Sequence, residues 1–151
     1  MYIKGKKINT NKKSKSKSKK VNIEKRLKVE KIAIDIVKEY YENINYTVKS
    51  VEKENVGWDL EAIIDKTKLK LEVKGLSGKE LQFELTPNEY EKSKKYIKDY
   101  RLCIVTNSLK TPVLKVFYYS YEDKKWTDGK IKLKIEEKIA AKFKEKICNG
   151  T

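Results

Sequence analysis

Apolar residues recur with the period of an α-helix from residue 22 to about residue 43. With 100° per residue, Ala33, Val37 and Tyr41 share one face, while lysine and acidic side chains gather on the opposite face. Asn22 is a residue type that often caps the start of a helix. The pattern therefore predicts a long amphipathic helix that buries one side against the rest of the protein.

A single carboxylate, Glu30, falls inside the apolar stripe of that helix, within about 60° of Ala33 and Val37 on the helical wheel. Burying an unpaired carboxylate costs free energy, so Glu30 must find a partner or stay neutral. Two interpretations stay open. Glu30 is either a functional group that faces a sheet, or a side chain that reaches solvent or pairs with Arg26 one turn earlier.

An alternation with period two marks a β-hairpin in the middle of the chain. Two strand-like runs, residues 58–64 and 69–73, are separated by the polar turn 65–68. In the second run, leucine and valine alternate with charged residues, so Glu72 and Lys74 lie together on the polar face. We expect the opposite face to pack against an apolar layer.

The length of the hairpin loop decides which carboxylates face each other. A two-residue loop sets Asp59 opposite Glu72, and a four-residue loop sets Glu61 opposite Glu72. Both registers keep Asp59 on the face that carries Glu72 and Lys74. Facing carboxylates repel unless a cation joins them, and a divalent metal with oxygen ligands would do so. The alternative is that these charges are simply solvated, as most charges on an outer strand face are.

The rest of the pattern predicts more strands and two more helices. The expected elements are strands at 46–53, 81–85, 102–106 and 113–119, a helix from Thr86 to about residue 98, and a C-terminal amphipathic helix marked by Ile135, Ile139, Phe143 and Ile147. The helix start at residues 86–89 is the best defined, because Thr86 can cap it, proline follows, and Glu89 completes a capping box.

Positive charge is concentrated at the N-terminus. Residues 1–20 hold nine lysines and no acidic residue, within a formal net charge of +15. Such a Lys/Ser-rich segment lacks the apolar residues needed for a core, so we expect a disordered tail. It is either a solubilising tail or an arm that contacts nucleic-acid phosphates. The candidate phosphate contacts are Lys12, Lys13, Lys15, Lys17, Lys19 and Lys20.

Composition excludes several classes of mechanism and partner. The chain has no histidine, which excludes Ser-His-Asp and Cys-His catalysis and histidine–metal sites. Any enzyme chemistry on nucleic acid must then use carboxylates, lysines and a metal. No apolar run approaches a transmembrane length and no secretory signal follows the basic N-terminus, so we expect no membrane partner. We expect Cys103 and Cys148 to be reduced and inert, as in a cytoplasmic protein.

Several short motifs in a fixed order resemble a known family. They are Val29-Glu30 with Ala33 and Val37, then NVGWDLEA, LEVKG, LTPNEY and YRLCIVTN. In this order they resemble the NO VEIN C-terminal domain family, a branch of the PD-(D/E)XK nuclease superfamily, over roughly residues 21–119. The resemblance implies an α/β fold with a mixed central sheet flanked by helices, a restriction-endonuclease-like core, in a single domain of residues 21–151.

The resemblance also implies roles for individual residues. Asp59 and Glu72 would bind Mg²⁺ or Mn²⁺, with the backbone carbonyl of Val73 as a further ligand. Lys74 would orient the attacking water and offset the charge on the phosphate. Glu30 would match the helix glutamate that completes the metal shell. The proline that precedes the aspartate in this superfamily is absent, and Trp58 takes its place.

These observations lead to one main expectation and two alternatives. We expect a metal-dependent endonuclease-like domain that hydrolyses nucleic acid, with DNA as the expected substrate. The alternatives are a non-catalytic nucleic-acid-binding module of the same fold and a structural basic protein, for example one associated with ribosomes. The oligomeric state stays open, with a homodimer among the options.

Overall fold

The computed structural model describes the backbone of residues 11–141 and 143–146, and side chains from residue 16 onward within these ranges. Its elements are α1 (Asn11–Asn43), β1 (Thr47–Ser50), the short 3-10 helix η1 (Glu52–Glu54), β2 (Leu60–Ile64), β3 (Thr67–Gly75), α2 (Pro87–Lys95), β4 (Tyr100–Thr106), β5 (Val113–Ser120) and β6 (Lys125–Thr127). Within the described part of the chain, no helix has the length and apolar composition that a membrane span requires.

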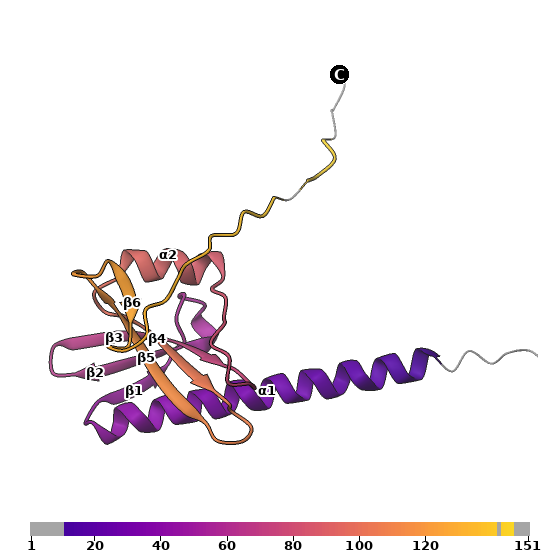
Figure 1. Ribbon diagram of the computed structural model, residues 1–151, viewed down its shortest axis with the longest axis horizontal. Helices are drawn as coiled ribbons and strands as arrows, with labels where there is room; N and C mark the ends of the chain where they lie inside the picture. The colour runs from indigo at the N-terminus through magenta and orange to yellow at the C-terminus, as the bar shows by residue number, and fades with distance from the viewer. Residues whose placement is uncertain (1–10, 142, 147–151) are drawn as a thin grey trace, which may run out of the picture.

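The strands form one sheet in the order of the sequence, β1 to β6. All neighbouring strands are antiparallel except β3 and β4, which are parallel and are connected through α2. Figure 1 shows α1 and α2 on opposite sides of this sheet. The predicted fold class, a mixed α/β sheet flanked by helices, is confirmed.

Each face of the sheet has its own apolar core. On one face, α1 contributes Ala33, Val37 and Tyr41, which pack against the alternate side chains Leu60 and Leu71 of the hairpin. On the face that α2 covers, Tyr100, Leu102, Ile104, Phe117 and Trp126 form a second core. Because side chains alternate along a strand, polar residues of the hairpin point toward the second face.

The hairpin has the two-residue loop. Leu60 pairs with Leu71 and Glu61 pairs with Lys70, so the constant sum of paired positions sets Asp59 opposite Glu72. A backbone hydrogen bond of 2.9 Å from the N–H of Asp59 to the carbonyl of Leu71 extends the pairing to this point. Of the two registers that the sequence allowed, the structure therefore has the one that brings Asp59 and Glu72 together.

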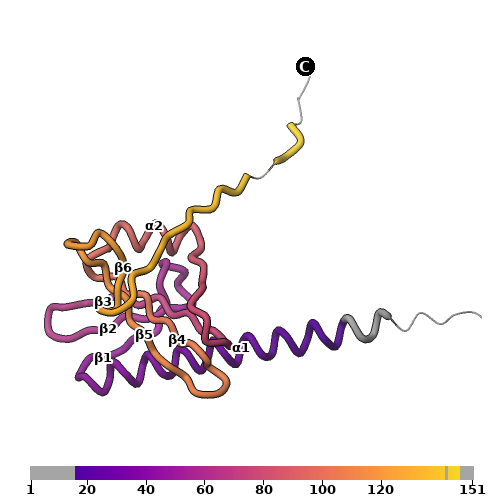
Figure 2. The backbone as a smooth tube through the Cα atoms, in the orientation of Figure 1, coloured from indigo at the N-terminus to yellow at the C-terminus, as the bar shows by residue number. Residues whose placement is uncertain are grey.

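Helix α1 begins earlier than the sequence pattern suggests. Its apolar face is as predicted, but the helix starts at Asn11 rather than Asn22 and includes residues 11–20, where we expected a disordered tail. No glycine or proline interrupts residues 11–43, and lysine is a good helix former, so the helix continues past its buried face. Figure 2 shows the coloured start of α1, drawn in indigo, extending beyond the sheet. Residues 1–10 of the expected tail lie outside the described residues.

Two other predicted elements are wrong. Residues 81–85 pair with no strand of the sheet; their apolar side chains instead pack, half-buried, on the second core. The C-terminal stretch is not helical where it is described. There Ile139 and Phe143 are 99 % and 93 % exposed, and a short helix without tertiary packing is marginal in water. Ile147 lies outside the described residues.

The two cysteines were both expected to be inert. Cys103 is free and fully buried in the core under α1, and burial raises the pKa of its thiol, which suppresses the reactive thiolate. Cys148 lies outside the described residues. The expectation therefore holds for Cys103.

Gly75, at the end of β3, allows the sheet to approach α1 closely. A Cβ atom at this position would lie 2.8 Å from both Val29 Cγ1 and the Val29 carbonyl oxygen. We expect Gly75→Ala to lower the free energy of unfolding by about 1–3 kcal/mol, because the helix backbone must shift. Gly78→Ala is the matched control, since no atom lies within 4 Å of its added Cβ. Urea unfolding measures both; equal effects would contradict the close approach.

Candidate active site

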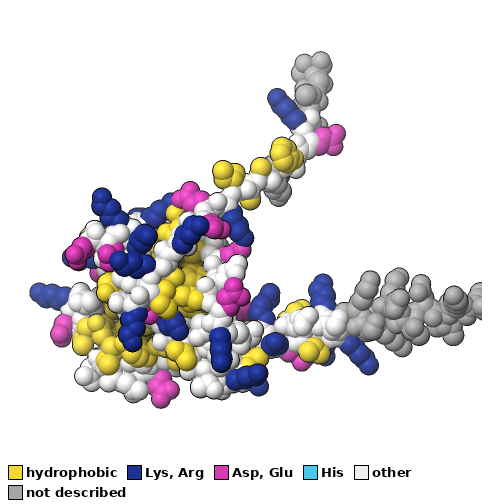
Figure 3. All heavy atoms as spheres, viewed as in Figure 1, with side chains coloured by type: hydrophobic (Ala, Val, Ile, Leu, Met, Phe, Trp, Pro, Cys, Tyr) yellow, Lys and Arg dark blue, Asp and Glu magenta, His cyan; other side chains and the backbone are white. Residues whose placement is uncertain are grey.

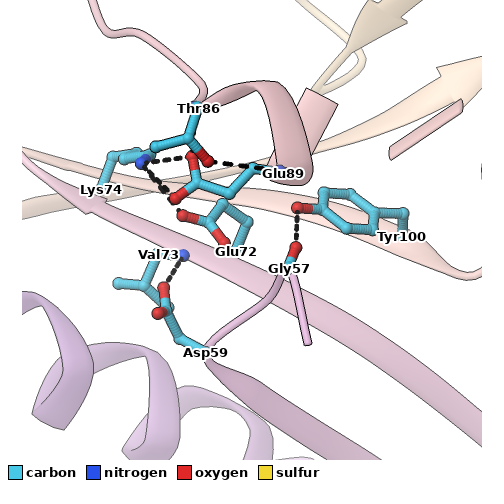
Figure 4. Close-up of polar contacts among 8 residues, drawn as sticks. All are labelled: Gly57, Asp59, Glu72, Val73, Lys74, Thr86, Glu89 and Tyr100. Atoms are coloured by element: carbon cyan, nitrogen blue, oxygen red, sulfur yellow. Dashed lines mark hydrogen bonds and ion pairs between the residues drawn. The ribbon is translucent and has the colours of Figure 1, made fainter. Parts of the chain in front are cut away.

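Asp59 is held rigidly just before β2. Its carboxylate Oδ2 accepts a 2.8 Å hydrogen bond from the backbone N–H of Val73 on β3 (Figure 4). Two residues earlier, Gly57 has a φ of 97° and its carbonyl accepts a 2.7 Å hydrogen bond from the buried Tyr100 hydroxyl. The segment that carries Asp59 is therefore fixed at both ends by contacts to the sheet.

Glu72 is the most buried charged group of the hairpin, with only 2 % of its surface exposed. Its Oε1 lies 3.0 Å from the ammonium of Lys74, but its Oε2 is buried and has no hydrogen-bond partner among the described residues. Burial, together with the facing Asp59 carboxylate, raises the pKa of Glu72 to about 9. An unsatisfied buried acceptor of this kind destabilises a fold by about 1–3 kcal/mol.

The pKa of Asp59 is also raised, to about 6, mainly because the group is buried and despite the hydrogen bond from Val73. Two facing carboxylates with raised pKa values mark a site that favours a proton or a cation. Both residues were predicted from the alternation in the hairpin, and the structure brings them together with Lys74 as expected.

Lys74 lies between two carboxylates. Its Nζ is 3.0 Å from Glu72 Oε1, and 3.0 Å and 3.2 Å from the two carboxylate oxygens of Glu89 on α2. Burial alone would lower the pKa of Lys74, but the two neighbouring carboxylates raise it. Lys74 therefore carries its positive charge at neutral pH and is 22 % exposed at the edge of the cluster.

Glu89 is the residue that sequence reasoning missed at this site. It was identified only as part of a capping box, and the capping box is present: Thr86 Oγ1 accepts from the Glu89 N–H, and Glu89 Oε2 accepts from the Thr86 N–H at 2.7 Å. Burial would raise the pKa of Glu89, but the Thr86 N–H and Lys74 hold it below its usual value. The only sequence signal for Glu89 is local and gives no sign of the contact with Lys74.

The predicted burial of Glu30 is wrong. Its side chain is 57 % exposed and lies 3.7 Å from Arg26 Nε, the ion pair that we considered as the alternative. Glu30 and Arg26 line a shallow groove of about 400 Å³ where α1 passes Gly75 and Ser77. Val29 rather than Glu30 points at the sheet here. The buried face of α1 becomes narrower at this point, because the helix extends beyond the edge of the sheet. The role of Glu30 in a metal shell stays a prediction.

The oxygen atoms near Asp59 suit a hard divalent cation. The N–H of Val73 points toward β2, where it donates to Asp59. Because the N–H and C=O of one residue point to the same edge of a strand, the Val73 carbonyl also points toward Asp59. Asp59, Glu72 and this carbonyl offer only oxygen, and Glu72 Oε2 has no other partner among the described residues. Those residues contain no ready-made group of three ligating side chains, but Mg²⁺ often binds one or two carboxylates and keeps several waters. The donor set therefore fits Mg²⁺ or Mn²⁺.

The candidate phosphate-binding lysines lie on the first turns of α1. Lys17, Lys19 and Lys20 are exposed, whereas the side chains of Lys12, Lys13 and Lys15 lie outside the described ones. On the face shown in Figure 3, further lysine and arginine side chains are spread over the body of the protein. The described helix thus presents positive charge away from the carboxylate cluster.

Comparison with known proteins gives one match. No curated protein and no solved structure matches the chain. The family model described as "Protein NO VEIN, C-terminal" matches residues 29–119. This range spans the sheet from β1 to nearly the end of β5 and contains Glu30, Asp59, Glu72, Lys74 and Glu89. The chain belongs to the NO VEIN C-terminal family.

Proposed function

We propose that this protein is a metal-dependent endonuclease that hydrolyses phosphodiester bonds, with DNA as its substrate. The observation that carries the proposal is the buried Glu72 facing the half-buried Asp59 beside Lys74, with one Glu72 oxygen lacking any partner among the described residues. Such an arrangement is costly for stability alone, and strongly perturbed carboxylates gather at functional sites.

Asp59, Glu72 and the Val73 carbonyl would hold Mg²⁺ or Mn²⁺, which would supply Lewis acidity and lower the pKa of a bound water. Lys74 offers a fixed positive charge that offsets charge developing on a phosphate. Similarity to the PD-(D/E)XK superfamily supports these roles by analogy, since that superfamily also uses two strand carboxylates and a lysine. Glu30 is the proposed additional ligand on the same analogy alone.

A binding module without turnover is the second candidate. One observation favours it: Lys74 is engaged by both Glu72 and Glu89, so its ammonium is not free to meet a substrate in this state. Metal dependence discriminates between the two candidates, because only hydrolysis requires a divalent ion at the carboxylates.

The direct test is a cleavage panel with single-stranded, duplex and branched DNA and matched RNA, each with Mg²⁺, Mn²⁺ or EDTA. We expect cleavage of at least one DNA substrate that EDTA abolishes. Binding without cleavage of any substrate would favour the binding module. Neither binding nor cleavage would favour the structural basic protein.

The lysines at the start of α1 are expected to contribute affinity rather than specificity. Replacing the six lysines between residues 12 and 20 by glutamine keeps helix propensity and removes charge. We expect weaker binding to every duplex alike, and a slope of log K against log salt that falls by about 0.9 for each phosphate that the variant no longer neutralises. Fluorescence anisotropy over a salt series measures both. An unchanged salt slope would mean that this segment does not touch the nucleic acid.

A further inference from the structure

Lys74 is held by carboxylates from two different elements. Glu72 belongs to the same strand as Lys74, whereas Glu89 reaches it from the first turn of α2. The proposed function assigns Glu72 to a divalent cation. A carboxylate bound to a cation is a weaker partner for an ammonium, because the metal draws on its charge and repels the second positive group.

Glu89 is better fixed than an ordinary surface glutamate. Its Oε2 accepts the N–H of Thr86 at 2.7 Å while also lying 3.0 Å from Lys74 Nζ, as Figure 4 shows. Thr86 in turn accepts the N–H of Glu89 and caps a helix whose first residue is Pro87. The carboxylate is therefore anchored to backbone atoms and is only 18 % exposed.

We propose that Glu89 is the positioning residue for Lys74: it keeps the ammonium beside the carboxylate pair when Glu72 is engaged by a cation. The role given to the Glu89–Lys74 contact rests on the proposed function. The contact itself is independent of that function, so it can be tested separately. Glu89 also lies within hydrogen-bonding reach of the Glu72 carboxyl group. It supplies no metal ligand and meets no substrate in this scheme, and its proposed effect is exerted through Lys74.

The first test measures how accessible the Lys74 amine is. The full-length protein is labelled with limiting isotopic acetic anhydride, and the extent at Lys74 is read by mass spectrometry relative to the exposed turn residue Lys66. We expect Glu89→Gln to raise Lys74 labelling severalfold in metal-free protein, and Glu89→Ala to raise it further. Glu91→Gln, an exposed glutamate on the same helix, is the matched control and should leave it unchanged.

Adding Mn²⁺ tests whether Glu72 binds the cation while Glu89 alone holds Lys74. In wild-type protein we expect Lys74 labelling to stay low with Mn²⁺, because Glu89 still holds the amine. In Glu89→Gln we expect Mn²⁺ to raise labelling well above the metal-free level of the same variant. An equal rise in wild type and variant would overturn the proposal, as would Lys74 labelling that is identical in wild type and Glu89→Gln.

Kinetics provide the functional readout. We expect Glu89→Gln to lower kcat by about 10- to 100-fold with little change in KM, the range typical of a partner that orients a functional group. Glutamine can still complete a capping box, so its melting temperature should stay near that of wild type, which Glu89→Ala need not match. Unchanged kcat in a variant whose Lys74 is released would overturn the positioning role.

These measurements separate the two proposals. If wild-type protein cleaves nothing and Mn²⁺ changes no labelling in any variant, the proposed function fails, and so does the proposal that Glu89 holds Lys74 while Glu72 binds a cation. The metal-free comparison of wild type, Glu89→Gln and Glu91→Gln still decides whether Glu89 fixes Lys74.

Discussion

Glu72→Gln is expected to abolish metal-dependent cleavage while making the metal-free protein more stable at neutral pH. Activity should fall by more than about 100-fold, the upper end of what loss of an indirect metal partner produces. Stability should rise because the substitution removes a buried, partly unsatisfied carboxylate. Cleavage assays with Mn²⁺ and thermal melts in EDTA measure the two effects.

The pH dependence of stability tests independently whether the ionised Glu72 carboxylate destabilises the metal-free protein. The pKa of Glu72 in the folded protein, about 9, lies above its ordinary value of 4.5, so between these values the folded state binds more protons than the unfolded state. Stability contributed by this group is therefore fully present near pH 4.5 and is lost as pH rises toward 9. Asp59, whose pKa is raised to about 6, causes a similar decline at lower pH in both proteins. We therefore expect the decline between about pH 6 and 9 in wild type and not in Glu72→Gln.

Glu61→Gln is the matched control on the same face of the hairpin. Glu61 is also buried, but Lys68 lies 2.7 Å from its carboxylate and the Trp58 indole donates to it. Its replacement should therefore lower stability or leave it unchanged, and should spare cleavage. A loss of stability in Glu72→Gln comparable to that in Glu61→Gln, or full residual cleavage, would remove Glu72 from the proposed site.

Mn²⁺ at one hundred times its Kd is expected to raise the free energy of unfolding by about 2.7 kcal/mol, because an ion that binds only the folded state stabilises it by mass action. Asp59→Asn should remove most of this gain, since one of two carboxylate ligands becomes neutral. The measurement is a thermal or urea unfolding curve with Mn²⁺ and with EDTA.

Asp65→Asn, in the turn of the same hairpin, is the control for Asp59→Asn. Asp65 has a φ of 48°, which asparagine tolerates, so the variant should keep the full response to Mn²⁺. An equal response in Asp59→Asn would contradict the ligand role of Asp59. Glu30→Gln is the third variant. A smaller stabilisation by Mn²⁺ than in wild type would support Glu30 as a metal ligand, and an unchanged stabilisation would exclude it.

Local patterns predicted most of the sheet and the centre of the site. The alternation in the hairpin was enough to place Asp59, Glu72 and Lys74 on one face, because side-chain direction in a strand depends only on parity. The turn sequence did not fix the loop length, so the facing partner of Glu72 stayed open between Asp59 and Glu61. Only the pairing in the folded sheet resolved it.

What the sequence did not predict depends on contacts between distant segments. The approach of Glu89 to Lys74 depends on how α2 crosses the sheet between β3 and β4, which no local pattern encodes. The exposure of Glu30 depends on where the sheet ends beneath α1, and the helical wheel has no information about that boundary. Residues 81–85 show the converse, since an alternating segment can be buried on one side without pairing as a strand.

The early start of α1 gives the basic segment mechanical stiffness. From Asn11 to Val29, the first residue buried against the sheet, a continuous helix spans roughly 27 Å at 1.5 Å per residue. A continuous helix is rigid compared with a disordered segment of the same length, so it holds its charges at a set distance from the hairpin. Under the proposed function, that distance corresponds to about eight base pairs of a duplex with 3.4 Å between successive phosphates of one strand, so the helix would fix the separation between the phosphates bound by the lysines and the bond that is cleaved.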